Sequence, residues 1–174
     1  MICLFDGEQP LRTPRLLLTP LDRSHLSGLG PWLQEAIEPE WSPADIEAGA
    51  VRGEAALISL AQGEAPVGLA ILGDGPHAKA ATVAFVCIEP AMRYRGLGGE
   101  AALAIERRLR GGLAVERVYA PVPETRGLAI YFWLRLGYRP LPFDRLRALL
   151  PSRAPAPPRF ATGAGGIWLL RDSD

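Results

Sequence analysis

Residues 92–105 read MRYRGLGGEAALAI and decide the fold, because a good helix here begins with residues that do not favour one. Its alanines, Leu103 and Ile105 suit a helix, and Glu106 and Arg110 form a favourable charge pair one turn apart. The opening instead holds three glycines and two arginines, and glycine is a poor helix residue. This composition predicts a turn whose backbone approaches another group closely where the helix starts.

That group is expected to be a phosphate. An apolar run ends at Ile88, a short loop follows, and the glycine turn then opens the helix. The first amides of a helix lack partners within the chain, and the helix dipole adds partial positive charge there. Glycines let phosphate oxygens approach the backbone, and Arg93 and Arg95 bring full positive charge.

Two nucleotide motifs and a purely structural role compete with this interpretation. A Walker phosphate loop ends in Gly-Lys-Ser/Thr, whereas this stretch has Gly-Gly-Glu, so that motif is excluded. Gly96, Gly98 and Ala101 fit the dinucleotide pattern G-x-G-x-x-A, but seven residues, Glu89–Arg95, separate the strand from the turn. Glu116 also precedes its strand instead of ending it, which disfavours a dinucleotide fold. A glycine turn needed only for close packing stays open on the local motif alone.

The rest of the chain alternates strand and helix patterns. Strands are expected at residues 15–19, 55–61, 66–73, 81–90, 115–122, 138–143 and 166–172. A first helix is expected from Asp22 or Ser24 to about Leu29, and a looser helical region from Pro31 to Gly53, with Ser42-Pro43 as a helix start. Two further helices are expected from the glycine turn to about Arg110 and from Thr125 to Leu136. Gly111-Gly112 and Gly137 are the expected stops of the last two helices.

This order predicts one α/β domain over residues 1–174. The run 81–90 is apolar on both faces, which indicates a central strand covered on both sides. An antiparallel meander, a crossover helix and further strands complete a mixed sheet. Residues 144–165 are rich in Pro, Gly and Ala and predict a mobile loop.

The composition is that of an ordinary globular protein, with 48% hydrophobic and 22% charged residues. Nineteen basic and nineteen acidic residues cancel, which disfavours nucleic acid as a partner. Cys3 and Cys87 are the only cysteines, and His25 and His77 stand alone, so neither a disulfide nor a metal site is expected. No signal peptide or long apolar run is visible, which predicts a soluble, cytoplasmic protein with no membrane contact.

Three motifs resemble one known family. Arg93-x-x-Gly96-x-Gly98 after an apolar strand is similar to the acetyl-CoA signature of GNAT-type N-acetyltransferases. The stretch LRTPRLLLTPL (residues 11–21) resembles the opening strand of ribosomal-protein and small-molecule acetyltransferases in that superfamily. The stretch GLAIYFWLRLGYRP (residues 127–140) is similar to its second cofactor motif. The resemblance covers Leu11 to Pro140 in the family's order and spacing.

The resemblance implies a GNAT-like, mostly antiparallel mixed sheet of about six to seven strands flanked by helices, with acetyl-CoA as the cosubstrate. The central strand is then expected to splay from its neighbour, so that the pantetheine arm pairs with the backbone of Val86, Cys87 and Ile88. The amide of Val86 is the expected oxyanion donor.

The same resemblance assigns further cofactor contacts. The diphosphate is expected to bind the glycine turn, and Arg126 stands where the family often has an Asn that contacts the pantetheine arm. Trp133 holds the position that is often a Tyr acid, and we expect it to pack against the cofactor arm because an indole cannot serve as the acid. The residues assigned to the turn are Arg93, Tyr94, Arg95, Gly96, Leu97, Gly98 and Gly99.

Acetyl transfer to an amine needs groups that take up and supply protons, and the sequence identifies these groups least clearly. The fourth-strand position that carries a Glu base in some relatives is Thr82 here, which cannot take a proton. Glu124, just after the fifth expected strand, is the preferred candidate base, and its alternative role is to cap the next helix. Tyr119 is a weak substitute for the acid, and His77 is expected to be exposed in a hairpin turn.

The acceptor is expected to be a primary amine, either a small molecule or a peptide N-terminus. Trp32 and Trp41 are interleaved with acidic residues, and such a rim attracts a cationic amine. A solvated acidic face is the alternative for that segment. A catalytically silent acyl-CoA-binding module is the alternative function. A homodimer is expected only because members of the resembled family often form one.

Overall fold

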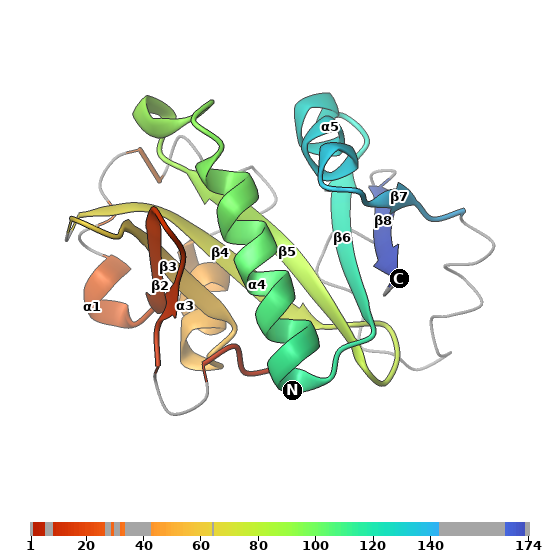
Figure 1. The fold of residues 1–174 in the computed structure, drawn as a ribbon, viewed down its shortest axis with the longest axis horizontal. Helices are drawn as coiled ribbons and strands as arrows, with labels where there is room; N and C mark the ends of the chain where they lie inside the picture. The colour runs from red at the N-terminus through yellow and green to blue at the C-terminus, as the bar shows by residue number, and fades with distance from the viewer. Residues whose placement is uncertain are drawn as a thin grey trace.

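Eight strands form one sheet in the computed structural model of the chain, in the order β1-β2-β3-β4-β5-β6-β8-β7 (Figure 1). The structure describes residues 2–5, 9–26, 29, 32–33, 43–63, 65–142 and 166–172. The strands are β1 (Leu11–Arg12), β2 (Leu16–Pro20), β3 (Ala55–Leu60), β4 (Pro66–Asp74), β5 (Ala80–Ile88), β6 (Arg117–Pro123), β7 (Arg139–Pro140) and β8 (Gly166–Asp172). The helices are α1 (Arg23–Leu26), α3 (Pro43–Val51), α4 (Leu97–Leu113) and α5 (Gly127–Arg135), with a 3-10 turn η2 (Pro90–Met92).

The sheet is mixed and mostly antiparallel, as the sequence predicted. All neighbouring strands pair antiparallel except β5 and β6, which are parallel. A parallel pair needs a crossover connection, and α4 supplies it between these two strands. Six to seven strands were expected. The additional strand is β1, which is only two residues long, and the strand expected at residues 138–143 is shortened to the two residues of β7.

Helices cover both faces of the sheet. In Figure 1, α4 and α5 lie on the near face, and α1 and α3 lie behind the sheet. On the near face Leu16 of β2 packs in one cluster with Ile105 and Leu109 of α4. On the far face Ile46 of α3 packs in a second cluster with Leu69 of β4. Side chains that alternate along the strands therefore enter two different cores, which explains the continuous apolar runs in the sequence.

Two expected helix boundaries differ from the structure. The helix α4 continues through Gly111 and Gly112 to Leu113, and Ala114 ends it in a left-handed conformation with φ of 52°. The N–H of Val115 then bonds to the carbonyl of Leu109, which is fully buried, so core packing extends the helix past its weak residues. The helix α5 begins at Gly127, two residues after the expected Thr125, because Thr125 and Arg126 belong to the turn after β6.

Other local expectations are confirmed. The carboxylate of Asp22 accepts the backbone N–H of Ser24 at 2.7 Å before α1, and α3 begins at Pro43. Gly137 has a φ of +89° just after α5. The predicted loop 144–165 lies outside the described residues. Among the helices that the structure describes, none is both long and apolar enough to cross a membrane.

Candidate active site

The strands β5 and β6 separate after a short paired segment. They pair only at Ala80–Arg117, Ala81–Val118 and Thr82–Tyr119. Beyond these three pairs β5 runs on to Ile88 and β6 to Pro123, and Figure 1 shows the two strands diverging toward the ends next to α4 and α5. Among the residues that the structure describes, no strand then pairs with the facing backbone edge of β5 beyond Thr82, which is the arrangement that accepts an extended ligand.

The direction of the backbone groups on β5 follows from three contacts. The N–H of Glu89 bonds to the carbonyl of Val67 on β4 at 2.8 Å. The carbonyl of Cys87 also faces β4, because a Cβ added to Gly68 would lie 2.3 Å from that oxygen. The carbonyl of Ile88 instead accepts Nε of Arg93 at 2.9 Å. Along a strand, the backbone N–H and C=O of successive residues point to opposite edges. The backbone N–H and C=O of Cys87 therefore face β4, whereas those of Val86 and Ile88 face the gap between β5 and β6.

The glycine turn lies at the end of β5. After η2 the chain passes Tyr94, with φ of 62°, and Gly96, with φ of 76°, and then enters α4. Gly96 is the N-cap of α4 and makes no side-chain capping bond. The first backbone bond of the helix runs from the N–H of Glu100 to the carbonyl of Gly96, so the amides of Leu97, Gly98 and Gly99 precede it. Such amides are donors suited to an anion.

Packing alone does not require the small residues at this turn. Leu97 is 4% exposed and anchors the turn in the core. A Cβ on Gly98 would lie 3.5 Å from Ile88 and from Phe132, and one on Gly99 would lie 3.5 Å from Leu136. These are ordinary contacts, so glycine is not demanded by packing at either position. The open backbone here favours close approach by a ligand over a purely structural turn.

The side chains expected to carry charge at the turn lie on the surface. Arg93, Tyr94 and Arg95 are exposed, and Tyr94 is 96% exposed. Arg93 is held back toward the strand by its bond to Ile88. The backbone carbonyl of Arg95 accepts Nη1 of Arg15 at 2.8 Å. The turn is therefore fixed from both sides by arginine side chains.

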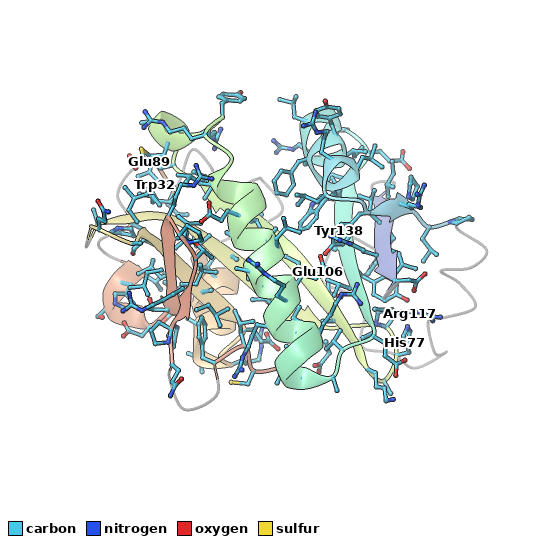
Figure 2. All side chains as sticks on the ribbon, in the orientation of Figure 1. Trp32, His77, Glu89, Glu106, Arg117 and Tyr138 are labelled. Carbon is cyan, nitrogen blue, oxygen red and sulfur yellow. The ribbon has the colours of Figure 1, made fainter. Side chains whose placement is uncertain are left out.

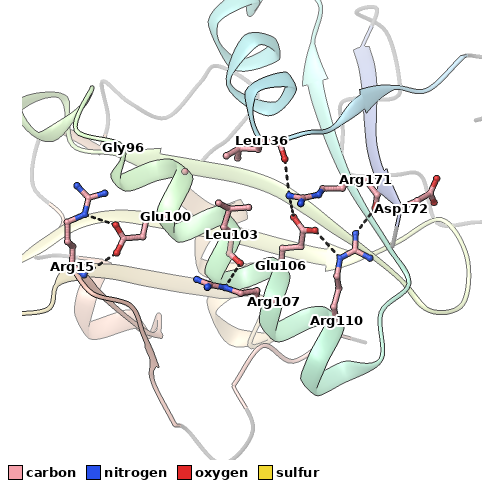
Figure 3. Close-up of a pocket in the computed structure, with 11 residues that line it drawn as sticks. Arg15, Gly96, Glu100, Leu103, Glu106, Arg107, Arg110, Leu136, Arg171 and Asp172 are labelled. Atoms are coloured by element: carbon pink, nitrogen blue, oxygen red, sulfur yellow. Dashed lines mark hydrogen bonds and ion pairs between the residues drawn. The ribbon is translucent and has the colours of Figure 1, made fainter. Parts of the chain in front are cut away.

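A groove of about 810 Å³ begins at this turn and runs along α4 (Figure 3). Gly96 and Gly99 line its start, and Arg107 and Arg110 line its far part. Leu136 and the end of β8 form its other wall. The groove connects the start of the helix with a surface that carries four arginines and three carboxylates, of which Arg15, Arg110 and Arg171 are ion-paired with Glu100 or Glu106. Its full lining is Arg15, Gly96, Gly99, Glu100, Leu103, Glu106, Arg107, Arg110, Leu136, Arg171 and Asp172.

The two predicted cofactor residues beyond the turn belong to α5. Arg126 is its N-cap residue and is partly buried. Trp133 is 5% exposed and packs in the near-face core. Its ring lies 4.8 Å from the ring of Tyr138 and 5.1 Å from that of Phe132, centroid to centroid. Tyr131 lies on the exposed side of the same helix, so it does not replace Trp133 in the core.

The candidate proton-transfer groups are placed as follows. Glu124 is exposed in the turn after β6, at the wide end of the gap. Thr82 is 1% exposed and donates its hydroxyl to the carbonyl of Asp74. Tyr119 is fully buried at the last paired position of β6, and its hydroxyl lies 2.9 Å from Nε2 of His77. Contrary to expectation, His77 is therefore partly covered and bonded to Tyr119.

The structure describes only some of the residues that are expected to contact the acceptor amine. Trp32, which is labelled in Figure 2, is partly buried and packs on the far-face core. Phe85 of β5 packs on the same cluster. Trp41 lies outside the described residues. Arg52 and Glu54 from the same acidic segment form an ion pair of 2.6 Å. Among the residues that the structure describes, no group of three or more His, Cys, Asp or Glu could hold a metal ion.

One part of the site was missed by the sequence analysis. Arg15 and Thr13, from the segment around β2, bind the carboxylate of Glu100 in the first turn of α4. Only the local pattern TPR before a strand marked these residues, and nothing in that pattern indicates a partner 87 positions from Thr13 and 85 positions from Arg15.

Comparison with known proteins identifies the family. The model of the "Acetyltransferase (GNAT) family" matches residues 26–138. The chain belongs to this family. As an acetyltransferase of this family it uses acetyl-CoA as its cosubstrate, as the sequence resemblance implied. A comparison with curated proteins gives no match.

Solved acetyltransferases share the fold of this GNAT chain. An acetyltransferase from Agrobacterium tumefaciens matches with a TM-score of 0.70 at 17% identity and covers 99% of both chains. The ribosomal-protein-S18-alanine N-acetyltransferase from Escherichia coli has a TM-score of 0.62 at 16% identity, covering 89% of this chain and 90% of that one. N-acetylglutamate synthase from Neisseria gonorrhoeae, complexed with coenzyme A and L-arginine, has a TM-score of 0.67 at 15% identity. That match covers 92% of this chain and 34% of the synthase, so this chain spans about a third of its length.

Proposed function

We propose that this acetyltransferase transfers the acetyl group of acetyl-CoA to the nitrogen of a primary amine by direct attack. The observation that supports this most strongly is the opening between β5 and β6. The N–H of Val86 faces that opening, and the uncapped start of α4 follows eight residues after Ile88, counting to Gly96. Acetyl-CoA supplies an activated thioester, and the chain supplies the groups that bind and orient it.

The residues fit such a ligand from end to end. The amides of Leu97, Gly98 and Gly99 bind the diphosphate at the positive end of the helix dipole. Val86 and Ile88 offer N–H and C=O groups to the two amides of the pantetheine arm, in the manner of an added strand. The N–H of Val86 is the donor best placed to polarise the thioester carbonyl, a contribution of about 10²–10³ in rate for one such donor.

Proton transfer rests on Glu124 and solvent in this proposal. The attacking amine must lose a proton, and Glu124 stands exposed at the wide end of the gap where an acceptor enters. Thr82 and Trp133 cannot take up a proton, and both are buried in bonded or packed positions. The departing thiolate is weakly basic, so solvent can protonate it without an acid from the chain.

The acceptor class is a small-molecule amine or a peptide N-terminus. The far face beside the gap carries aromatic surface from Trp32 and Phe85, which suits an amine carried on an apolar group. The related proteins named above act on chemically different acceptors by their names, a ribosomal-protein alanine and glutamate. The acceptor must therefore be found by experiment.

A panel assay tests the proposal against the silent module. Coenzyme A release from acetyl-CoA is measured with amino acids, polyamines, aminoglycosides and peptides with free N-termini, while calorimetry measures coenzyme A binding. We expect saturable binding and acceptor-dependent thiol release. Binding without turnover on any acceptor would favour the silent acyl-CoA-binding module, and no binding at all would reject both.

Substitution of Glu124 tests the assignment of the base. Glu124→Gln is expected to lower kcat and to flatten the acid limb of the pH profile, because the amide cannot accept the proton. Glu116→Gln is the matched control, since Glu116 is also an exposed carboxylate but pairs with Lys79 instead of lying at the gap. Unchanged activity and pH profile in Glu124→Gln would remove this residue from the mechanism.

A further inference from the structure

Arg15 connects the strand β2 with the glycine turn and with the first turn of α4 (Figure 3). Its Nε donates to Oε2 of Glu100 at 2.6 Å, and its backbone N–H donates to Oε1 of the same carboxylate at 3.0 Å. Its Nη1 donates to the carbonyl of Arg95 at 2.8 Å. A Cβ on Gly96 would lie 3.5 Å from Nη2 of Arg15, so the guanidinium lies directly beside the N-cap of α4.

Glu100 presents an electrostatic conflict at this position. A carboxylate in the first turn suits the helix dipole when the turn is empty, yet it repels an anion that binds the same amides. Its side chain is only 15% exposed, so water screens it poorly. Burial opposes the charge, but the hydrogen bonds from Thr13 and Arg15 outweigh burial and lower the pKa of the carboxyl. Glu100 is therefore charged at neutral pH.

We propose that Arg15 is a positioning residue for the coenzyme A diphosphate: it cancels the charge of Glu100 and holds the turn open through the carbonyl of Arg95. The bond from Nη1 of Arg15 fixes the direction of the Arg95 carbonyl, one residue before the N-cap of α4. This inference rests on the proposed function, because it concerns how the same site accepts the diphosphate.

The chain contains a matched control for the loss of one paired arginine. Arg52 and Glu54 form an ion pair with the same Nε–Oε2 distance of 2.6 Å, and their side chains are 52% and 12% exposed. The corresponding values for Arg15 and Glu100 are 2.6 Å, 50% and 15%. Arg52 follows α3, on the far face of the sheet, and does not line the groove. Arg52→Met therefore removes a comparable ion pair without touching the turn.

The test measures coenzyme A binding by calorimetry in four variants. Arg15→Met is expected to raise Kd about tenfold, as loss of a charge-assisted contact does. Glu100→Gln is expected to lower Kd about threefold, because it removes the repelling charge and its amide oxygen still accepts the Thr13 hydroxyl and the Arg15 backbone N–H, although the bond from Arg15 Nε is lost. The double variant is expected to bind more tightly than Arg15→Met alone, and Arg52→Met is expected to stay within about twofold of the wild type.

Opposite changes in Kd for Arg15→Met and Glu100→Gln distinguish a positioning role of Arg15 from a merely structural one. If the ion pair only stabilised the fold, Arg15→Met and Glu100→Gln would both weaken binding, and that result overturns the proposal even if one variant folds poorly. An Arg15→Met variant that binds like Arg52→Met also overturns it. Wild-type protein that shows no coenzyme A binding rejects the proposed function itself, so the two failures are distinguishable.

Discussion

Gly96 and Gly111 lie at opposite ends of α4 and should respond oppositely to the same substitution. Gly96 has φ of +76°, a conformation that costs about 1–2 kcal/mol for a residue with a Cβ. Gly111 lies inside the helix, and a Cβ there meets nothing within 4 Å. We expect Gly96→Ala to lower the free energy of unfolding by about 1 kcal/mol and Gly111→Ala to raise it by about 0.5–1 kcal/mol.

Urea denaturation followed by circular dichroism measures both changes in unfolding free energy. Each variant serves as the control of the other, because both add one methyl group at a helix glycine. Equal changes in unfolding free energy for Gly96→Ala and Gly111→Ala would contradict the argument from the positive φ of Gly96.

The charge of Glu100 makes part of the stability depend on pH. Its pKa in the folded protein lies below the ordinary value of 4.5, since the bonds from Thr13 and Arg15 favour the carboxylate over the opposing effect of burial. A lowered pKa means that the unfolded chain binds the proton more readily. The stabilisation is therefore complete above the ordinary value and is lost as the pH falls through the folded one.

The comparison of wild type with Glu100→Gln measures this dependence. We expect the difference in unfolding free energy to be constant between about pH 6 and 8 and to shrink below about pH 4.5. Urea midpoints at a series of pH values provide the data. A difference that stays the same down to pH 3 would show that the carboxylate charge does not contribute.

At the scale of single residues, the sequence predicted the positions that follow from local chemistry. Gly96 at the helix start and Asp22 as a cap are such positions, because their roles depend on neighbours within a few residues. The bond between Arg15 and Glu100 could not be predicted in this way. It joins residues 85 positions apart, and only the placement of β2 beside α4 brings them together.

At the scale of single elements, the strand β5 allows a test of the site, because one of its backbone edges bonds to β4 and the other faces the gap. The N–H of Val86 faces the gap, so Val86→Pro removes no bond to β4, whereas Cys87→Pro interrupts the ladder with β4. We expect Cys87→Pro to lower the unfolding free energy by at least about 1–3 kcal/mol more than Val86→Pro does. Chemical denaturation of the two variants measures the difference.

The same pair of variants reports on activity. Val86→Pro is expected to lower kcat about 10²–10³-fold, since it removes the proposed oxyanion donor. A folded Val86→Pro variant with wild-type kcat would exclude that role for Val86, whatever its stability. Cys87→Pro shows how far damage to the strand alone affects the rate.

The helix α4 shows why element boundaries were harder to predict than element types. Gly111 and Gly112 predicted its end, because glycine is a local stop signal. The helix nevertheless continues to Leu113, which packs against the near-face core after the buried Leu109. Tertiary burial outweighs a local cost of about 1 kcal/mol for each glycine.

For the whole molecule, the order of strands and helices was predictable because apolar periodicity marks each long element. The splay of β5 from β6 was expected only through the family resemblance, since no residue of either strand encodes the divergence by itself. The strand β1 is two residues long, too short for a periodic signal, and it exists because β2 offers a partner at the sheet edge. The strand expected at residues 138–143 pairs with β8 only at the two residues of β7.

One buried carboxylate ties the C-terminal part of the sheet to the central helix. Glu106 of α4 is 6% exposed at its side chain and accepts Nε of Arg110 at 2.9 Å. It also accepts Nη1 of Arg171 from β8 and the hydroxyl of Tyr138, each at 3.3 Å. Burial, together with this carboxylate, raises the pKa of Tyr138, so its hydroxyl stays protonated and donates. Arg171 reaches on to the carbonyl of Leu136 at 2.9 Å.

Removal of this carboxylate should therefore loosen the whole near face. Glu106→Ala removes the carboxylate that Arg110 and Arg171 share, although both arginines keep bonds to backbone carbonyls, and it removes the acceptor of the buried Tyr138 hydroxyl. We expect it to lower the unfolding free energy by about 3 kcal/mol. Glu116→Ala is the matched control, because Glu116 is 62% exposed and pairs with Lys79 at 2.7 Å, a pair worth about 0–1 kcal/mol. Urea unfolding measures both, and hydrogen exchange at β8 locates the loss. A cost for Glu106→Ala no larger than that for Glu116→Ala would mean that packing of the apolar core, and not this carboxylate, holds β8 against α4.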